Sequence, residues 1–376
     1  MDIKFFMDAL DRHDFSFFTG IPDSLLSVFC DELVNRHGAN TKNHIVAHNE
    51  GGCVALASGY HLATGKVSCI YLQNSGIGNI LNPVVSLTHP KVYGIPNLFI
   101  IGWRGEPGCK DEPQHLFQGE ITLCLLETLE IDYFIIDDTT MPDDIEQALI
   151  RFNGLFQRGK SAAFVVKKSA FLGNNRSYSN NHQLNREVAI KIVLEASEND
   201  AIVSTTGKIS RELFELRRFN NDCGEKDFLT VGSMGHSVMI ALGIALHRPE
   251  HRIWCLDGDG ALLMHMGGLG LVGNQQPEKF VHVLLNNVAH ETVGGMPTVA
   301  ECIDFSSIAR SCGYQHVYKA KDEDSLKIEL TQAKLQKGPV FIEVEIALGS
   351  RSDLGRPTST TYENKKKFMD FISARG

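Results

Sequence analysis

The chain has 376 residues, 43% of them hydrophobic, which is enough for two globular domains with packed cores. Its 36 basic and 45 acidic residues give a net charge of −9, which argues against nucleic acid or an anionic membrane as a partner. The nine cysteines contain no CxxC pair, so they support neither a zinc ribbon nor a redox dithiol and suit a reducing compartment. The sequence shows no signal-peptide pattern and no apolar run of ~18 residues, so we expect a cytoplasmic protein without a membrane span.

In chain order, the first half alternates short apolar runs with helical patterns. The runs predict strands at residues 15–19, 67–72, 98–102, 133–136 and 162–166, with helices such as 24–36 and 51–64 between them. A polar segment rich in Asn and Ser then follows at residues 172–184 and shows no periodicity. We therefore predict a domain of residues 1–171, a linker, and a second domain of residues 185–376.

The second half repeats this alternation. Helices are predicted at residues 186–196 and 237–246, and strands at residues 201–204, 253–256, 281–285 and 340–346. Strands that alternate with helices favour parallel sheets covered on both faces. The predicted fold class is α/β, with two doubly wound parallel-sheet domains of similar size.

Two short motifs follow strands of the second domain. Gly258-Asp259-Gly260 ends one predicted strand, and Asn286-Asn287 ends the next, after 25 intervening residues. Glycines at the carboxyl end of a strand let the backbone approach a phosphate, and carboxylate and amide oxygens suit Mg²⁺. Each motif alone would be an ordinary turn, but the pair at this spacing predicts a site for a diphosphate and its metal.

This pair resembles the signature of thiamine-diphosphate (ThDP) enzymes. The resemblance implies that Asp259, Asn287 and the carbonyl of Ala289 hold Mg²⁺. It also implies that Glu50, near the start of a helix of small residues, lies beside the cofactor's pyrimidine ring. Taken alone, Glu50 would be a charge at a helix N-terminus. A second resemblance, Gly232-Ser233-Met234-Gly235, implies that the Gly232 carbonyl and the Met234 side chain contact the cofactor, although Met234 also suits core packing.

The remaining contacts expected with the cofactor lie in turns that follow strands. They are Asn74 in the first domain, and Thr206, Gly207, Gly258, Gly260 and Ala261 in the second. The GxGxxG pattern at residues 268–273 suggests a dinucleotide site instead, but it lies inside a predicted helix with no strand directly before it. We therefore do not predict nucleotide binding there.

Four further segments, at residues 19–26, 102–115, 287–298 and 349–357, resemble the phosphonopyruvate decarboxylase family, with sulfopyruvate decarboxylase the nearest relative by substrate. The pattern departs at Met296, where a polar residue is expected. The resemblance implies the decarboxylation of 3-phosphonopyruvate to phosphonoacetaldehyde and CO₂ in phosphonate biosynthesis. It also implies a homo-oligomer of at least two chains, with the active site at the subunit interface.

A phosphonate needs cationic partners, preferably guanidinium groups. The candidates within these segments are Arg104, Lys110, Arg351 and Arg356, each of which would otherwise be a solvated surface charge. Candidates for the proton transfer are His115, then Asp23, then His290, which also stands near the expected substrate site. The open alternatives are decarboxylation of sulfopyruvate or another anionic 2-oxoacid, carboligation, and a non-catalytic ThDP-binding subunit.

Overall fold

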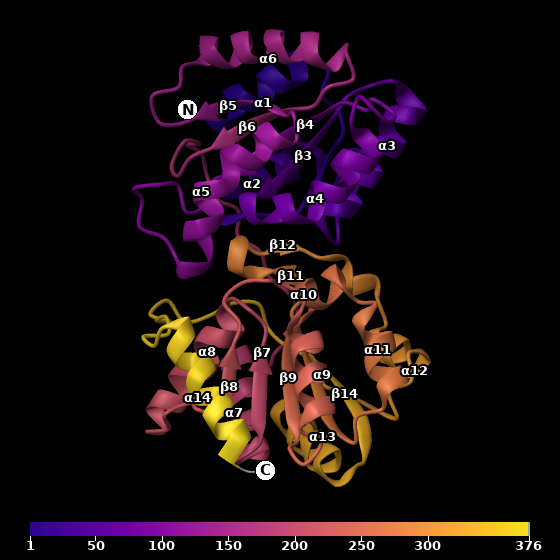
Figure 1. The fold of residues 1–376 in the computed structure, drawn as a ribbon, viewed down its shortest axis with the longest axis vertical. Coiled ribbons are helices and arrows are strands. Elements are labelled where there is room, and N and C mark those ends of the chain that lie inside the picture. Colours follow the sequence, from indigo (N-terminus) through magenta and orange to yellow (C-terminus); the bar gives the residue numbers. More distant parts are fainter. Residues whose placement is uncertain (375–376) are drawn as a thin grey trace. The chain divides into compact units, whose positions relative to one another are not determined.

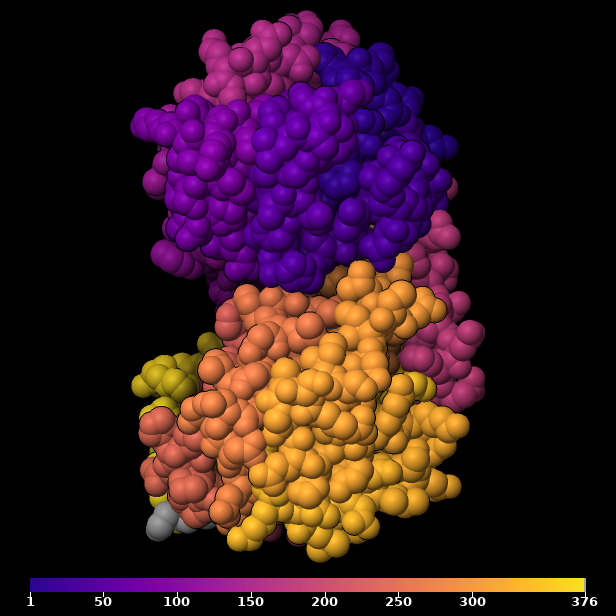
Figure 2. Space-filling model, turned by 90° about the vertical axis from the view of Figure 1, so that its right-hand side faces the viewer, coloured from indigo at the N-terminus to yellow at the C-terminus, as the bar shows by residue number. Residues whose placement is uncertain are grey.

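The computed structural model describes residues 1–374. The chain divides into two compact units, Met1–Ser177 and Tyr178–Gly376 (Figure 1). Figure 2 shows one face of the chain, on which indigo and violet atoms form most of the surface of the first unit and orange atoms most of that of the second. The change from one unit to the other falls inside the polar segment 172–184.

The first unit contains a six-stranded parallel sheet in the order β2-β1-β3-β4-β6-β5. Its strands are β1 (Phe18–Gly20), β2 (His44–Val46), β3 (Ser68–Gln73), β4 (Asn97–Gly102), β5 (Asp132–Ile136) and β6 (Ala162–Val166). Its helices are α1 (Ile3–Arg12), α2 (Ser27–His37), α3 (Glu50–Thr64), α4 (Ile77–Pro83), α5 (Pro113–Thr128) and α6 (Pro142–Phe156). Residues of α3, α4 and α5 share one core with the sheet, while α1 packs with α2 and α6.

The second unit contains another six-stranded parallel sheet, in the order β13-β14-β10-β9-β7-β8. Its strands are β7 (Ala201–Ser204), β8 (Asp227–Leu229), β9 (Ile253–Gly258), β10 (Lys279–Asn286), β13 (His316–Ala320) and β14 (Gly338–Glu345). A short antiparallel pair, β11 (Ala289–His290) and β12 (Met296–Pro297), follows β10. The helices are α7 (Arg186–Ser197), α8 (Lys208–Phe219), α9 (Ser237–His247), α10 (Asp259–Met264), α11 (Gly268–Gln275), α12 (Phe305–Ser311), α13 (Glu323–Leu335) and α14 (Thr361–Ala374).

Alternation of side chains along the strands explains why helices cover both faces of this sheet. Trp254 and Leu256 of β9 point into the core shared with α7, α8 and α13, whereas Ile253 and Cys255 point into the core shared with α9, α11 and α14. Because both faces are buried, the strands read as nearly continuous apolar runs. The predicted α/β fold class with two parallel sheets is thereby confirmed.

Two strands of the second unit, β8 and β13, were not predicted. Both are edge strands of three and five residues, and each begins with a polar residue, Asp227 or His316. An edge strand need not be apolar on both faces, so its sequence signal is weak. The GxGxxG pattern lies in α11, as predicted, and not in a strand-to-helix turn. None of the helices within residues 1–374 combines the length and the apolar character that crossing a membrane requires.

Candidate active site

The predicted metal and diphosphate motifs lie at one edge of the second sheet. Asp259 follows β9 and Asn287 follows β10, and these strands are neighbours in which Leu285 pairs with Gly258. Thr206 and Gly207 follow β7, the neighbour of β9 on its other side. From β7 the chain continues to β8 on one side of it, and the next strand, β9, lies on the other side of β7. The topological switch point is therefore between β7 and β9, and open α/β sheets bind their ligands at the carboxyl ends of the strands at such a point.

Asp259 is a buried carboxylate at the start of α10. Burial raises its pKa to about 7, and the hydroxyl of Thr298, which donates to Oδ2 at 2.7 Å, opposes the rise together with backbone N–H groups of Gly260 and Asn287. Within residues 1–374, the largest influences on this pKa are burial and hydrogen bonds, and no cationic side chain is among them. A bound divalent cation would favour the ionised carboxylate, so the site fits Mg²⁺.

Asn287 is buried and held by polar contacts on both sides of its amide. Its Nδ2 donates to Glu291 at 2.7 Å, and its Oδ1 accepts from the backbone N–H of Ala289 at 3.1 Å. Residues 1–374 contain no cluster of three or more His, Cys, Asp or Glu side chains suited to a metal. The predicted donor set does not require one, because it takes a single carboxylate and draws its other protein oxygens from an amide and a backbone carbonyl.

The predicted diphosphate turns have the small residues and the backbone that a phosphate cradle needs. Gly207 has a φ of +88°, and a Cβ added there would lie 2.9 Å from Oγ1 of Thr292. Thr206 Oγ1 donates to the Val231 carbonyl at 2.7 Å, which fixes this turn against the segment before Gly232. A Cβ added at Gly258 would meet Ile209 at 3.5 Å. Ala261 is buried in the first turn of α10.

Met234 and His290 both lie close to Gly260. A Cβ added at Gly260 would be 3.0 Å from His290 Nδ1 and 3.5 Å from Met234 Cε. The structure therefore brings the predicted wedge residue and one predicted substrate residue to the same turn. Burial lowers the pKa of His290 to about 4, so its imidazole is neutral near pH 7 and offers a hydrogen bond rather than a charge to an anion.

In the first unit, Glu50 opens α3 and is 5% exposed. Asn49 caps the helix by accepting from Gly52 N, and this cap fixes the point at which the helix begins. Asn79 Nδ2 donates to Glu50 Oε2 at 2.7 Å, while a Cβ added at Gly76 would lie 2.5 Å from Oε1. Burial raises the pKa of Glu50, and the Asn79 contact lowers it in part. A buried carboxyl group with a raised pKa fits a partner that shares a proton, as a pyrimidine nitrogen does.

Gly76 and Asn79 were not singled out from the sequence. They lie close after Asn74, which was expected to contact the cofactor, but nothing in the sequence showed that they contact Glu50. The hydrogen bond from Thr298 to Asp259 was likewise not predicted, although Thr298 is the last residue of the family segment 287–298.

Asp23, Asn74 and Arg104 are brought together by strands β1, β3 and β4. Asp23 accepts from Gln73 Nε2 at 2.5 Å and from the Leu25 N–H at 3.0 Å, and burial raises its pKa. Asn74 Oδ1 accepts from the Arg104 N–H at 3.1 Å, and its Nδ2 donates to the Arg104 carbonyl and to Thr122. Asn74 therefore holds the Arg104 backbone through both ends of its amide group and contacts helix α5 at Thr122.

The guanidinium of Arg104 contacts Asp111 at 2.5 Å and donates to Ser24 at 3.0 Å. His115 stands in the first turn of α5, and burial followed by the charge of Arg104 lowers its pKa to about 4. Its imidazole is therefore neutral near pH 7. Lys110, in the same loop, is exposed.

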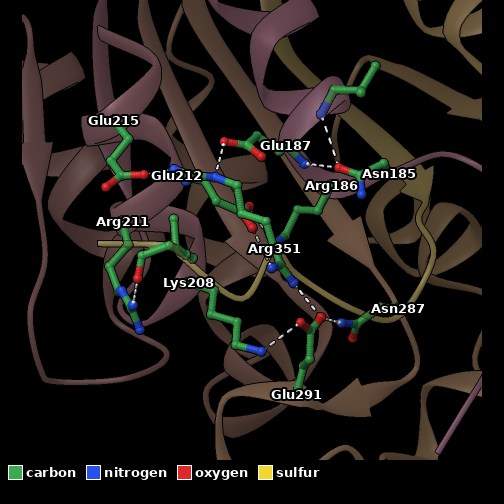
Figure 3. A network of polar contacts seen from close by, with 12 residues as sticks. Asn185, Arg186, Glu187, Lys208, Arg211, Glu212, Glu215, Asn287, Glu291 and Arg351 are labelled. Atoms are coloured by element: carbon green, nitrogen blue, oxygen red, sulfur yellow. Dashed lines mark hydrogen bonds and ion pairs between the residues drawn. The ribbon is translucent and has the colours of Figure 1, made fainter. Parts of the chain in front are cut away.

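Arg351 anchors the segment 349–357 to α7 and α8. Its guanidinium contacts Glu187 at 3.0 Å, Asp353 at 3.1 Å and also Glu215 (Figure 3). The charge of Arg351 is thus compensated inside the second unit. Arg356, in the same segment, is exposed.

Comparison with known proteins identifies both units. Residues 3–126 match the N-terminal and residues 205–344 the C-terminal TPP binding domain of thiamine pyrophosphate enzymes, another name for ThDP enzymes. The chain is 33% identical over 378 residues to a phosphonopyruvate decarboxylase of Streptomyces viridochromogenes, covering 94% of this chain and 90% of the relative. It is 33% identical to the corresponding protein of Streptomyces hygroscopicus, with the same coverage. It is 35% identical over 167 residues to the sulfopyruvate decarboxylase subunit beta of Methanothermobacter thermautotrophicus, covering 44% of this chain and 84% of that subunit.

Proposed function

The chain belongs to the phosphonopyruvate decarboxylase family of ThDP-dependent 2-oxoacid decarboxylases, and from this premise we propose that its substrate is 3-phosphonopyruvate. The products would be phosphonoacetaldehyde and CO₂, within phosphonate biosynthesis. The observation that carries the proposal is the similarity to two phosphonopyruvate decarboxylases over 94% of the chain, which spans both units. Sulfopyruvate is the second candidate substrate, because the similarity to sulfopyruvate decarboxylase subunit beta reaches 35% over a shorter region.

When bound, ThDP accepts the electrons that the departing carboxylate of a 2-oxoacid leaves behind. In our proposal Glu50 shares a proton with the pyrimidine ring, and its burial supports this role. Asp259, Asn287 and the Ala289 carbonyl would hold Mg²⁺, and the raised pKa of the buried Asp259 carboxyl group supports a cation there. The other proposed cofactor contacts are Asn74, Thr206, Gly207, Gly232, Met234, Gly258, Gly260 and Ala261.

The phosphonate tail would be bound by Arg104, Lys110, Arg351 or Arg356, with His290 donating a hydrogen bond. For the proton transfer we now favour Asp23 over His115. Burial raises the pKa of Asp23, so its carboxyl group can hold a proton nearer to neutral pH. The pKa of His115 is lowered to about 4, so this imidazole remains neutral and is a weak base near pH 7.

We also propose a homo-oligomer whose active site combines Glu50 of one chain with Asp259 of another. Exposed apolar side chains on α3, on α4 and on the helical turn Val84–Thr88 support an interface there: Leu56, Leu62, Leu81 and Val85 are 38–77% exposed. Two inactive variants, Glu50→Gln and Asp259→Ala, test the arrangement. Random re-association of the two in a dimer should restore about a quarter of the wild-type activity, because only mixed dimers contain an intact site. No recovery, with mixed dimers shown to form, would place both residues on one chain.

The substrate is tested by release of CO₂ from a panel of 2-oxoacids with ThDP and Mg²⁺ present. Phosphonopyruvate should be consumed far faster than pyruvate, and faster than sulfopyruvate. Equal rates for phosphonopyruvate and pyruvate would refute the assignment. Glu50→Gln should retain cofactor binding and lose most turnover. Turnover by the purified chain alone would also exclude a non-catalytic subunit, and aldehyde rather than ligation product would exclude carboligation.

A further inference from the structure

A buried network of charges lies directly behind the proposed metal ligand Asn287. Glu291, in the turn after β11, accepts from Asn287 Nδ2 through Oε2 and from Lys208 Nζ through Oε1, at 2.7 and 2.9 Å (Figure 3). Arg186 of α7 also contacts Glu291, and it binds Glu212 of α8 through two hydrogen bonds of 2.7 Å. The side chains of Arg186 and Glu212 are 3% and 1% exposed, so this part of the network is shielded from solvent.

The network is balanced in charge and tied to three elements. Its two cations, Arg186 and Lys208, face two carboxylates, Glu212 and Glu291. Breaking such a buried pair is costly, because the remaining charge is left without compensation. Glu291 is therefore held from two sides, by Arg186 of α7 and by Lys208, the first residue of α8. Through its hydrogen bond with Asn287, it also restricts the position of the loop after β10.

The chemistry of the contacts allows Asn287 only one amide orientation. A carboxylate such as Glu291 only accepts hydrogen bonds, and the backbone N–H of Ala289 only donates one. The amide nitrogen must therefore face Glu291, and the amide oxygen must face Ala289 N. An amide oxygen has two lone pairs. One is taken by Ala289 N, so the second stays available for a metal ion.

We propose that Glu291 is a positioning residue that orients the Asn287 oxygen toward the metal, with Arg186, Lys208 and Glu212 fixing Glu291 in turn. The proposal rests on the proposed metal site. Lys208 adds a second consequence, since it directly follows Gly207. Its contact with Glu291 ties the diphosphate turn to the metal loop, so that these two parts of the cofactor site are held together.

The experiment measures Mg²⁺ affinity by calorimetric titration of the full chain at saturating ThDP, in addition to turnover. Glu291→Gln should raise the Kd for Mg²⁺ by about 10- to 100-fold, the usual effect of removing a group that orients a metal ligand. Asp227→Asn is the matched control. It breaks another buried arginine–carboxylate pair of this unit, with Arg217, which does not contact Asn287, so it should lower the Tm and leave the Kd within about two-fold.

A double-mutant cycle separates positioning from a general loss of structure. If Glu291 acts through Asn287, adding Glu291→Gln to Asn287→Ala should change the Kd far less than it does in the wild type. If Glu291→Gln does not fold, Lys208→Gln/Glu291→Gln removes one charge of each sign and leaves the Arg186–Glu212 pair intact. The proposal is overturned if the folded variant binds Mg²⁺ like the wild type, if the two effects simply add, or if Asn287→Ala alone leaves the Kd unchanged. Tight Mg²⁺ binding by a wild type that does not consume phosphonopyruvate would refute the substrate and leave this inference standing.

Discussion

Gly76→Ala is a minimal perturbation of the proposed catalytic carboxylate. Gly76 has φ −72° and ψ −10°, which alanine adopts freely, so the backbone is not the obstacle. The new methyl group would lie 2.5 Å from Glu50 Oε1, 2.7 Å from Cγ and 2.8 Å from Cδ. An ordinary van der Waals contact begins at 3.4 Å, so the carboxyl group must move by about 0.9 Å.

The expected loss of activity follows from this displacement. A catalytic group misplaced by about 1 Å can lower the rate by roughly 100-fold, which corresponds to about 2.7 kcal/mol in the activation free energy. The fold should survive, because the atoms that must move belong to a flexible side chain and not to the backbone. We expect a stability cost of about 1–3 kcal/mol, as for other overpacked sites.

The assay compares kcat for CO₂ release, ThDP affinity and thermal unfolding in Gly76→Ala and a matched control. Gly78→Ala is that control, because a Cβ added at Gly78 meets no atom of residues 1–374 within 4 Å apart from its chain neighbours and the backbone of its own helix. Gly78→Ala should retain wild-type kcat, whereas Gly76→Ala should lose about two orders of magnitude with ThDP affinity changed little. A kcat in Gly76→Ala within a few-fold of the wild type would refute the reasoning.

Three further outcomes are expected. Asp259→Ala should abolish the Mg²⁺ dependence of ThDP binding, and an unchanged affinity measured by calorimetry would contradict the metal assignment. Arg351→Ala should raise KM for phosphonopyruvate but not for pyruvate; a lower Tm with KM unchanged would make Arg351 only the anchor of segment 349–357. His44 is buried, and burial lowers its pKa from 6.5 to about 4. Between pH 6.5 and pH 4 the unfolded chain therefore binds a proton at His44 that the folded chain does not, and the free energy of unfolding falls as the pH decreases. Between pH 7 and pH 4, the free energy of unfolding measured with urea should fall by about 3 kcal/mol more in the wild type than in His44→Asn. Equal losses in both proteins would exclude His44 as the cause.

Much of the candidate site was predictable because it is encoded locally. A strand buried on both faces is a continuous apolar run, and the turn after it is short and rich in Gly, Asp or Asn. This local signal located Asp259 and Asn287, and the confirmed parallel sheet places them after neighbouring strands. Glu50 was assigned through the resemblance to ThDP enzymes, because taken alone it would be an ordinary charge at the N-terminus of a helix of small residues. The edge strands β8 and β13 carry no such signal and were missed.

Only the tertiary structure decided which side chains support these residues. Thr298 contacts Asp259 across 39 residues of sequence, Asn79 contacts Glu50 across 29, and Arg186 contacts Glu291 across 105. The tertiary structure also pairs Arg351 with Glu187 and Asp353, whereas the sequence predicted Arg351 as a cation that binds the substrate. A hydrogen bond or ion pair forms between atoms a few ångströms apart, and for residues far apart in sequence that distance depends on strand order and helix packing. The sequence by itself therefore determined the fold class and the residues suited to the chemistry, and the folded chain determined how they are held.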